Sequence, residues 1–532
     1  MSQFKLTIVS LLVAQAIATY AGAATHTVSM DGVIGKDVVV MGNDSLNADI
    51  AHSFNSGTTT LFTGNSKLLA SAAQAISAGV QNFKDASYLQ VTAANAINGG
   101  RQNFYDHSYI ELAGADLLGN NLAFNLADAD TRLIVAGQHA QLGVLEGKGQ
   151  VSNNSNSDGT LALDTGKWGS SSFAGVLTNG TGTGKLNLLK LGAGEWIYNG
   201  DGSAMTGTTT VNGGQLTVNG DLSQSSVTVN RDGTLAGSGS VGAVKVNAGG
   251  VLGTEKITDR LKVNGDLSFA KLGTYYANLG AGGQAGRVEV KGQADLNVAS
   301  LYVTASADSY AANTRYTILT ADGGITDRFD YVRSSLYFLT PKLTYNANSV
   351  ELELTRNQRA IASVARSASA TNLANSLENR DNTLVNHVLT SDEHTAAAAL
   401  EQLAGAASAS RAAAMLASNA QVGYGMLKAM EQRDSRGNSL QSAALRSDGP
   451  LPVSNAVPGA NGQVWLQGLG SQGSFEGTEH AANMQQRTQG ALLGADWAVG
   501  EAWRAGVVGG YGKTDLDAGD YLGDAVTSYH LG

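Results

Sequence analysis

The sequence contains no cysteine and only 4 prolines in 532 residues. The lack of cysteine excludes disulfides, thiolate catalysis and cysteine-ligated zinc. Charged residues make up only 15% of the chain and the net charge is −10, which argues against a nucleic-acid-binding surface. No proline precedes Pro341, as expected if nearly every strand amide before that point donates a ladder hydrogen bond.

Glycine is abundant, with 67 residues, and this composition is typical of many short strands joined by turns. Residues 75–91 and 96–112 are nearly identical and start 21 residues apart (96 − 75 = 21). The repeat aligns Phe83 with Phe104 and Tyr88 with Tyr109, and Phe62 lies one period earlier. A fixed period of about 20 residues indicates stacked structural repeats.

Short apolar runs between residues 25 and 356 alternate with glycine, asparagine, aspartate and serine. Such runs predict strands of about four to six residues, which form the rungs of a β-solenoid. A set of β-sandwiches is the alternative all-β arrangement, but the 21-residue register argues against it. The stacked Phe83/Phe104 and Tyr88/Tyr109 pairs are expected to form aromatic ladders, and the two tyrosines could also belong to a binding face.

The N-terminus predicts export from the cytoplasm. Residues 1–5 carry a positive charge, residues 6–18 are mostly apolar, and Ala21 and Ala23 offer small side chains to signal peptidase. We expect a secretory signal peptide cleaved after Ala23. The alternative, an N-terminal membrane anchor, is disfavoured because the apolar run is shorter than the about 20 residues of a spanning helix.

The composition changes after residue 356. Residues 360–430 are alanine-rich with a helical pattern; Thr390 and Glu393 have capping-box spacing, and a second helix is expected over 408–431. Residues 446–462 hold three of the four prolines and predict a linker. In "WRAGVVGGYG", Trp503 and Tyr511 share one strand face about 27 Å apart at about 3.4 Å per residue. With Trp497, they predict the aromatic girdles of a membrane-spanning strand; a soluble barrel strand is the alternative.

Residues 188–222, "LLKLGAGEWIYNGDGSAMTGTTTVNGGQLTVNGDL", resemble the passenger-associated repeat of type V autotransporters. The signature positions are Gly192, Gly194, Trp196, Gly207, Val211, Gly214, Leu216 and Val218, together with others that include Leu189 and Lys190. Residues 227–356 resemble the pertactin-like module that ends the passenger and, in that family, nucleates its folding. "GQVWLQGLGSQGSFEG", "QGALLGADWAVGEAWRAGVVGGYGKTDLD" and "DAVTSYHLG" resemble the opening strands of the translocator barrel.

The predicted fold class is therefore all-β: a right-handed parallel β-solenoid, an alanine-rich helical linker, and the first strands of an outer-membrane β-barrel. The predicted segments are a signal peptide (1–23), an N-terminal solenoid (24–185), an autochaperone-type module (186–356), the linker (357–461) and barrel strands (462–532). The family barrel has about twelve strands, whereas about four precede Gly532. We therefore expect either a fragment or a decayed copy.

The resemblance implies an outer-membrane and cell-surface location in a Gram-negative bacterium, reached through the periplasm. The implied partners are the Sec machinery, the outer-membrane barrel assembly machinery and an unidentified surface ligand, with no nucleic acid. The helix at 408–431 resembles the linker helix that occupies the barrel lumen in this family.

The catalytic motifs in the sequence are weak. "VVVMGNDSLNADI" (38–50) is similar to the nucleophile block of GDSL esterases, but Asn43 interrupts it and no Asp-x-x-His follows Ser45 in the passenger. "NGDGS" (199–203) lacks the acidic spacing of a calcium loop. We expect no catalytic, cofactor-binding or metal-binding residue, and a non-enzymatic passenger for adhesion or autoaggregation in virulence. The alternative is an enzymatic passenger: an esterase using Ser45, or a glycan-cleaving solenoid.

Overall fold

The computed structural model describes residues 27–29, 38–49, 54, 57–305, 314–405, 451–454, 462–476, 483–499, 503–517 and 523–532, with short pieces of 411–427. Positions 115, 119, 120, 168 and 381 lie outside the description. The chain forms two compact units. The first comprises 1–335 with 340–355, and the second comprises 336–339 with 356–532.

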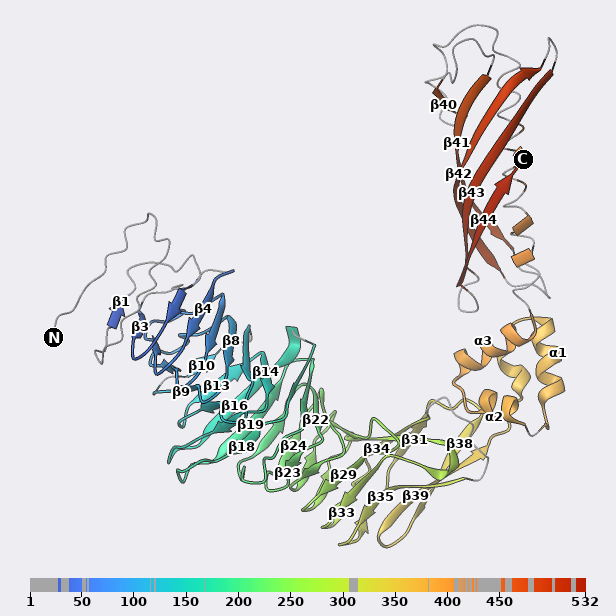
Figure 1. The fold of residues 1–532 in the computed structure, drawn as a ribbon. Coiled ribbons are helices and arrows are strands. Elements are labelled where there is room, and N and C mark those ends of the chain that lie inside the picture. The colour runs from blue at the N-terminus through green and yellow to red at the C-terminus, as the bar shows by residue number, and fades with distance from the viewer. Residues whose placement is uncertain are drawn as a thin grey trace. The chain divides into compact units, whose positions relative to one another are not determined.

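The first unit is a parallel β-solenoid whose short strands stack into long sheets (Figure 1). One sheet has 14 described strands: β2 (Val38–Val40), β4 (Thr59–Phe62), β6 (Val80–Phe83), β8 (Gly100–Phe104), β11 (Leu122–Leu126), β14 (Val144–Gly147), β17 (Ser170–Phe173), β20 (Glu195–Tyr198), β22 (Gly214–Val218), β25 (Gly233–Ala236), β28 (Val251–Gly253), β31 (Thr274–Leu279), β34 (Ser300–Ala305) and β37 (Tyr331–Ser334).

Two further sheets complete most of each rung. The 10-stranded sheet contains β10 (Leu117–Leu118), β13 (His139–Leu142), β16 (Gly159–Asp164), β19 (Leu186–Leu191), β21 (Thr209–Val211), β24 (Val227–Val229), β27 (Val244–Val246), β30 (Leu267–Phe269), β33 (Ala294–Asp295) and β36 (Ile325–Thr326). The 8-stranded sheet contains β1 (Thr27–Ser29), β3 (Ser45–Ala48), β5 (Lys67–Ala70), β7 (Tyr88–Val91), β9 (Tyr109–Leu112), β12 (Arg132–Ile134), β15 (Gln150–Ser152) and β18 (Val176–Thr178).

The 7-stranded sheet belongs to the C-terminal half of the solenoid and contains β23 (Asp221–Leu222), β26 (Ser240–Val241), β29 (Arg260–Val263), β32 (Arg287–Val290), β35 (Arg315–Ala321), β39 (Ser349–Arg356) and β38 (Leu339–Tyr345). Its strand β39 pairs antiparallel with β35. By contrast, β29 pairs parallel with β32, and β32 pairs parallel with β35. Two short 3₁₀ turns, η1 (Thr165–Lys167) and η2 (Ala281–Gly283), interrupt the strands.

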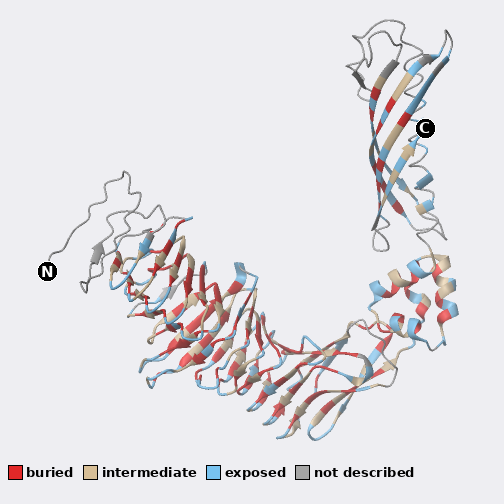
Figure 2. Cartoon of the chain, viewed as in Figure 1, coloured by how far each residue is buried: buried red, intermediate tan, exposed pale blue. Residues whose placement is uncertain are grey.

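The 21-residue repeat corresponds to one rung. Phe62, Phe83 and Phe104 are aligned in register on neighbouring strands of the 14-stranded sheet. Their rings stack with centroid distances of 4.7 and 4.9 Å, and all three side chains are fully buried. Buried residues line the interior along the solenoid (Figure 2). The predicted aromatic ladders are confirmed, since Tyr88 and Tyr109 also stack at 4.9 Å, on the half-buried outer side.

Repeated polar residues hold the turns between these rungs. The hydroxyls of Ser87 and Ser108 donate to backbone carbonyls within their own turn and on the preceding rung. The carboxylate of Asp106 accepts the backbone N–H of Asp85 at 3.1 Å, and that of Asp128 accepts the N–H of Asp106 at 2.9 Å. The hydroxyl of Thr63 and the N–H of Gly64 bond to Asp85 and lower the pKa of its carboxyl.

The second unit begins with a small helical bundle. It contains η3 (Ile361–Val364), α1 (Ala368–Leu377), α2 (Thr383–Leu389) and α3 (Glu393–Leu403), which pack around a buried core that includes Phe338 and Leu400. The expected capping box at Thr390 is wrong. Asp392 caps α3, because its carboxylate accepts the N–H of Thr395 at 2.9 Å. The described positions between 411 and 427 are helical.

The C-terminal part of this unit is an antiparallel sheet of β40 (Leu451–Ser454), β41 (Gly462–Phe475), β42 (Met484–Val499), β43 (Trp503–Asp517) and β44 (Gly523–Leu531). Its long strands alternate in burial. Trp465, Leu492 and Val508 form a buried cluster on one face. In the part of the chain that the structure describes, no helix has the length and apolarity required to cross a bilayer.

We expect Phe83→Ala to lower the free energy of unfolding of the purified chain by about 3–5 kcal/mol, because it removes the middle ring of a buried stack. Urea denaturation followed by circular dichroism measures the change. Lys84→Ala, at the exposed neighbouring position, is the control. Equal losses for both variants would contradict a core built from the repeated phenylalanines.

Candidate functional site

The predicted repeat motif forms one well-packed part of the solenoid around β19–β22. Trp196, Val211, Leu216 and Val218 are fully buried, as their alternation in the sequence predicts. The indole N–H of Trp196 donates to the carbonyl of Leu145 at 3.4 Å, and its ring lies 5.6 Å from that of Tyr198. The motif therefore contributes the large side chains that fill the interior at this level.

The motif glycines occupy turns in which a side chain would not fit. Gly192 and Gly214 have φ values of 69° and 61°, in the left-handed region. At Gly207 a Cβ atom would lie 1.9 Å from the carbonyl oxygen of Leu186, and at Gly194 it would lie 2.2 Å from that of Gly169. Close approach between successive rungs therefore requires glycine at these positions.

Lys190 is the unusual residue of the motif, because a cationic side chain lies fully buried inside the solenoid. Its Nζ donates to the backbone carbonyls of Leu191 (2.6 Å), Gly192 (3.0 Å) and Gly213 (3.1 Å). The ammonium group thus joins two turns that belong to successive rungs. Burial lowers the pKa of Lys190 to about 8, and the carboxylate of Asp164 opposes this shift.

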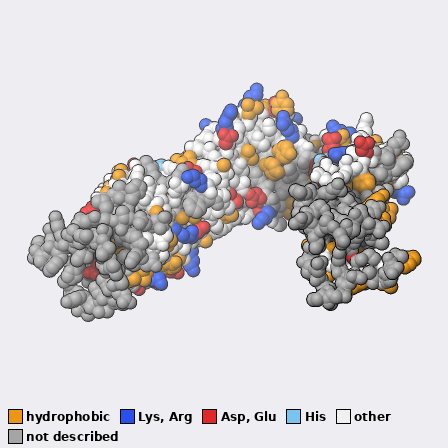
Figure 3. Space-filling view, turned by 90° about the horizontal axis from the view of Figure 1, so that it is seen from above, with side chains coloured by type: hydrophobic (Ala, Val, Ile, Leu, Met, Phe, Trp, Pro, Cys, Tyr) orange, Lys and Arg blue, Asp and Glu red, His pale blue; other side chains and the backbone are white. Residues whose placement is uncertain are grey.

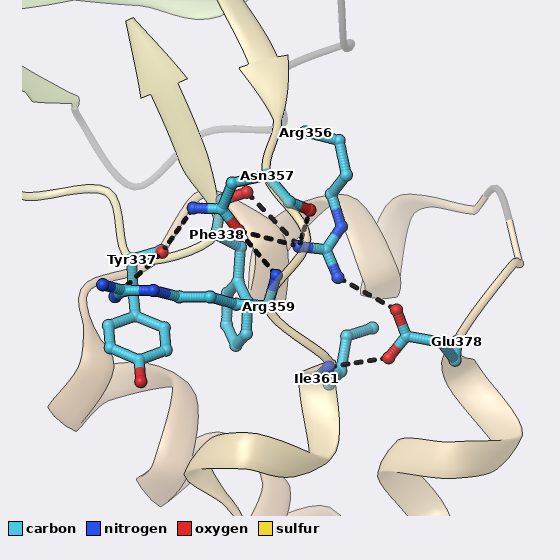
Figure 4. Close-up of polar contacts among 7 residues, drawn as sticks. All are labelled: Tyr337, Phe338, Arg356, Asn357, Arg359, Ile361 and Glu378. Carbon is cyan, nitrogen blue, oxygen red and sulfur yellow. Dashed lines mark hydrogen bonds and ion pairs between the residues drawn. The ribbon is translucent and has the colours of Figure 1, made fainter.

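Within the second unit, a polar junction joins residues 337–338 and 356–361 to the C-terminal end of α1 (Figure 4). The guanidinium of Arg356 forms an ion pair with Glu378 at 3.0 Å and donates to the carbonyl of Phe338. The second carboxylate oxygen of Glu378 accepts the N–H of Ile361 at 2.6 Å. The guanidinium of Arg359 lies 4.2 Å from the ring centroid of Tyr337, a cation–π contact.

The C-terminal sheet exposes one apolar face. Its exposed side chains include the three predicted girdle residues, Trp497, Trp503 and Tyr511. Trp497 lies opposite Ala505 and Trp503 opposite Val499, so the two tryptophans lie near one end of the strands. Tyr511 lies opposite Tyr529, with ring centroids 5.6 Å apart, nearer the middle of the described strands. The assignment of these aromatics to membrane girdles stays a prediction.

The candidate nucleophile Ser45 lies at the start of β3, directly after the turn at residues 41–44, and is half-buried. Thr27 and Lys67 flank it on neighbouring strands. The predicted signal-cleavage residues Ala21 and Ala23, and the histidine at position 52, lie outside the described residues. The Nζ of Lys67 donates to the side-chain oxygen of Gln90 at 2.6 Å, so in this structure the lysine beside Ser45 bonds to another residue.

The described solenoid contains two histidines, His107 and His139. The ring of His107 lies 3.8 Å from the carboxylate of Asp130, and both side chains are exposed. In the described portion of the solenoid, no recorded hydrogen bond joins either ring to a serine hydroxyl. Among the described residues, acidic and histidine side chains also form no cluster that could hold a metal ion.

Comparison with known proteins found one matching family and two similar curated proteins. Residues 464–532, which form β41–β44, match the family described as "Autotransporter beta-domain". Two proteins from Serratia marcescens, both named "Extracellular serine protease", are also similar. One is 28% identical over 392 residues, covering 66% of this chain and 37% of that protein. The other is 27% identical over 380 residues, covering 62% of this chain and 35% of that protein.

Residues 464–532 therefore belong to an autotransporter β-domain, as the sequence resemblance predicted. The β-solenoid precedes this domain in the chain and corresponds to a passenger. The chain spans about a third of the length of the curated relatives it matches. The roles given above to individual motif residues remain predictions.

The expectation that the passenger is not an enzyme is contradicted, because both curated relatives are named as serine proteases. The expectation relied on the lack of short catalytic motifs. A Ser-His-Asp triad is defined by geometry, and its members come from distant parts of a chain in different orders on different folds. The absence of a short catalytic motif therefore does not exclude catalysis.

Sequence reasoning missed three features of this structure. A lysine within the apolar run "LNLLKL" was a visible signal for a buried, carbonyl-bonded cation at Lys190. The aspartates at 85 and 106 share the 21-residue period, which could have identified them as turn caps. The ion pair between Arg356 and Glu378 left no sequence signal, because it depends on how α1 packs.

We expect Lys190→Met to remove a pH dependence of stability. The unfolded chain keeps this proton up to the ordinary lysine pKa of 10.5, whereas the folded chain releases it near pH 8. Wild-type stability relative to the variant should therefore rise between pH 8 and 10.5, by up to about 3 kcal/mol. Urea denaturation at each pH measures the difference, with exposed Lys185→Met as control. A constant difference across this range would contradict a lowered pKa of Lys190 in the folded chain.

We expect Glu378→Ala to speed hydrogen exchange of the Ile361 amide by about tenfold, since the variant removes that amide's acceptor. Exchange measured by mass spectrometry over residues 356–365 tests this. Glu393→Ala, at an exposed position in the first turn of α3, is the matched control. Unchanged exchange in Glu378→Ala would show that the junction does not stabilise the bundle.

Proposed function

We propose that this autotransporter exports a hydrolase that cleaves peptide bonds, with the solenoid as its passenger. The observation that carries the proposal is the similarity of most of the chain to two proteins named as extracellular serine proteases. The alternative raised from the sequence, an enzymatic passenger, agrees with that similarity better than a non-enzymatic surface protein does. The substrate class is taken from the names of those relatives.

The architecture supports the export part of the proposal. The match of residues 464–532 to the β-domain family supports a location at the outer membrane or cell surface of a Gram-negative bacterium. The exposed apolar face of β41–β44, with Trp497, Trp503 and Tyr511 on it, suits contact with lipid. The solenoid is a separate compact unit and can therefore fold as the exported part.

The proposal requires an activated serine as the nucleophile. Ser45 is the serine that the sequence singles out, and it lies half-buried beside a turn. The hydroxyl of Ser528 lies 2.9 Å from the ring of His530, and both residues belong to β44 in the β-domain. A direct chemical search for an activated serine is therefore the decisive experiment.

The test uses the full chain purified from producing cells and a fluorophosphonate probe, which reacts with activated serine nucleophiles. We expect labelling of one passenger serine, mapped by mass spectrometry, and hydrolysis of casein that the same reagent blocks. If Ser45 is the nucleophile, Ser45→Ala should abolish both signals. Ser170→Ala, at an exposed serine on β17, should leave them unchanged.

One outcome would contradict the proposal, and another would assign the reaction to a different serine. No labelled serine together with no casein hydrolysis would contradict a serine protease in this chain. Labelling and hydrolysis that survive in Ser45→Ala would exclude Ser45 and leave the mapped serine as the nucleophile.

A further inference from the structure

The 14-stranded sheet of the solenoid ends at β37 with a free edge. Within the described residues, β37 pairs with β34 on one side and with no strand on the other. The N–H of Asp330 donates to Ala299 at 2.9 Å on the β34 side. Because alternate residues of a strand direct their backbone groups to opposite sides, Tyr331 and Arg333 present theirs to the free edge.

This edge lacks the protection that the neighbouring edge strand carries. Strand β38, at the edge of the 7-stranded sheet, contains Pro341 and Lys342. Proline removes a backbone donor, and lysine on an edge disfavours pairing with another strand. Strand β37 has the sequence YVRS, with no proline, and its recorded register with β34 has no bulge. Strand β38 therefore carries residues that disfavour pairing with a further strand, whereas β37 does not.

The side chains of β37 are also unusually exposed. Val332 is in register with Leu301, which is fully buried, yet Val332 is 38% exposed. The apolar interior is thus uncovered at this strand. Tyr331 is 59% exposed. Aromatic side chains exposed beside uncovered apolar surface are typical of protein interfaces.

Arg333 adds a charge preference to this edge. It is exposed and lies in register with Tyr302, whose ring stacks on that of Tyr276 at 5.3 Å. No recorded ion pair joins Arg333 to a carboxylate in the described part of the chain. On the face seen in Figure 3, basic and acidic side chains are interspersed among the described residues. An exposed arginine without an ion-pair partner favours a binding partner that carries a negative charge.

We propose that β37 is a docking strand for an extended peptide, which adds to the free edge as one further parallel strand. The peptide would place an apolar side chain over Val332 and an acidic side chain beside Arg333. Its backbone would bond to the free N–H and C=O groups of Tyr331 and Arg333. Addition of a strand to an exposed sheet edge is a general mode of peptide recognition, in which alternate side chains give the specificity. The proposal is independent of the hydrolytic activity.

The test measures binding of a fluorescein-labelled hexapeptide, Thr-Tyr-Val-Glu-Val-Thr, to the purified full chain by fluorescence anisotropy. We expect Arg333→Glu to weaken binding of this peptide by about tenfold and to strengthen binding of the analogue with lysine in place of glutamate. A peptide N-methylated at alternate amides should bind neither the wild-type chain nor the Arg333→Glu variant. Lys342→Glu, on the proline-containing edge, is the matched charge-reversal control and should change nothing.

A second variant and a second readout separate docking from a folding defect. Arg333→Pro removes the free backbone donor and should abolish binding of both peptides while the melting temperature stays near that of the wild type. Hydrogen exchange should show protection of the Tyr331 and Arg333 amides when the peptide is added. The proposal is overturned if Arg333→Glu and Lys342→Glu bind the glutamate peptide equally, or if N-methylation does not weaken binding.

Discussion

Parallel backbone pairing between successive rungs is the constraint on which the solenoid depends. Because each rung aligns with the next in fixed register, a side chain that points inward on one strand has its counterpart directly above it. The stack of Phe62, Phe83 and Phe104 follows from this alignment. The interior is filled by these stacks, so any ligand must use the outer faces, the turns or the ends of the unit.

The same constraint explains which exceptions the interior tolerates. Lys190 can be buried because three carbonyls at the turns of two rungs accept hydrogen bonds from its ammonium group. Burial still disfavours the charged form and therefore lowers the pKa of Lys190. The motif glycines permit the close backbone approach that brings those carbonyls together. The residues of this motif therefore form one packing unit around the ammonium group of Lys190.

Much of the fold could be predicted from sequence because rung stacking leaves a period. The 21-residue spacing of Phe83 and Phe104 predicted their register, and the alternation in the motif predicted the burial of Val211 and Leu216. Features that depend on the packing of distant segments could not be predicted. The pairing of Arg356 with Glu378 needs the folded bundle, and Asp392 replaced Thr390 as the cap of α3 through local geometry. The enzymatic class was misjudged because catalytic residues need not be neighbours in sequence.

The proposed export requires that the β-domain carries the solenoid to the cell surface. The chain has no cysteine, so a single Lys245→Cys substitution at an exposed position of β27 gives one reactive thiol. The measurement is labelling of intact producing cells with a membrane-impermeant maleimide. Labelling without permeabilisation is the predicted result. Labelling only after the outer membrane is permeabilised would contradict surface display.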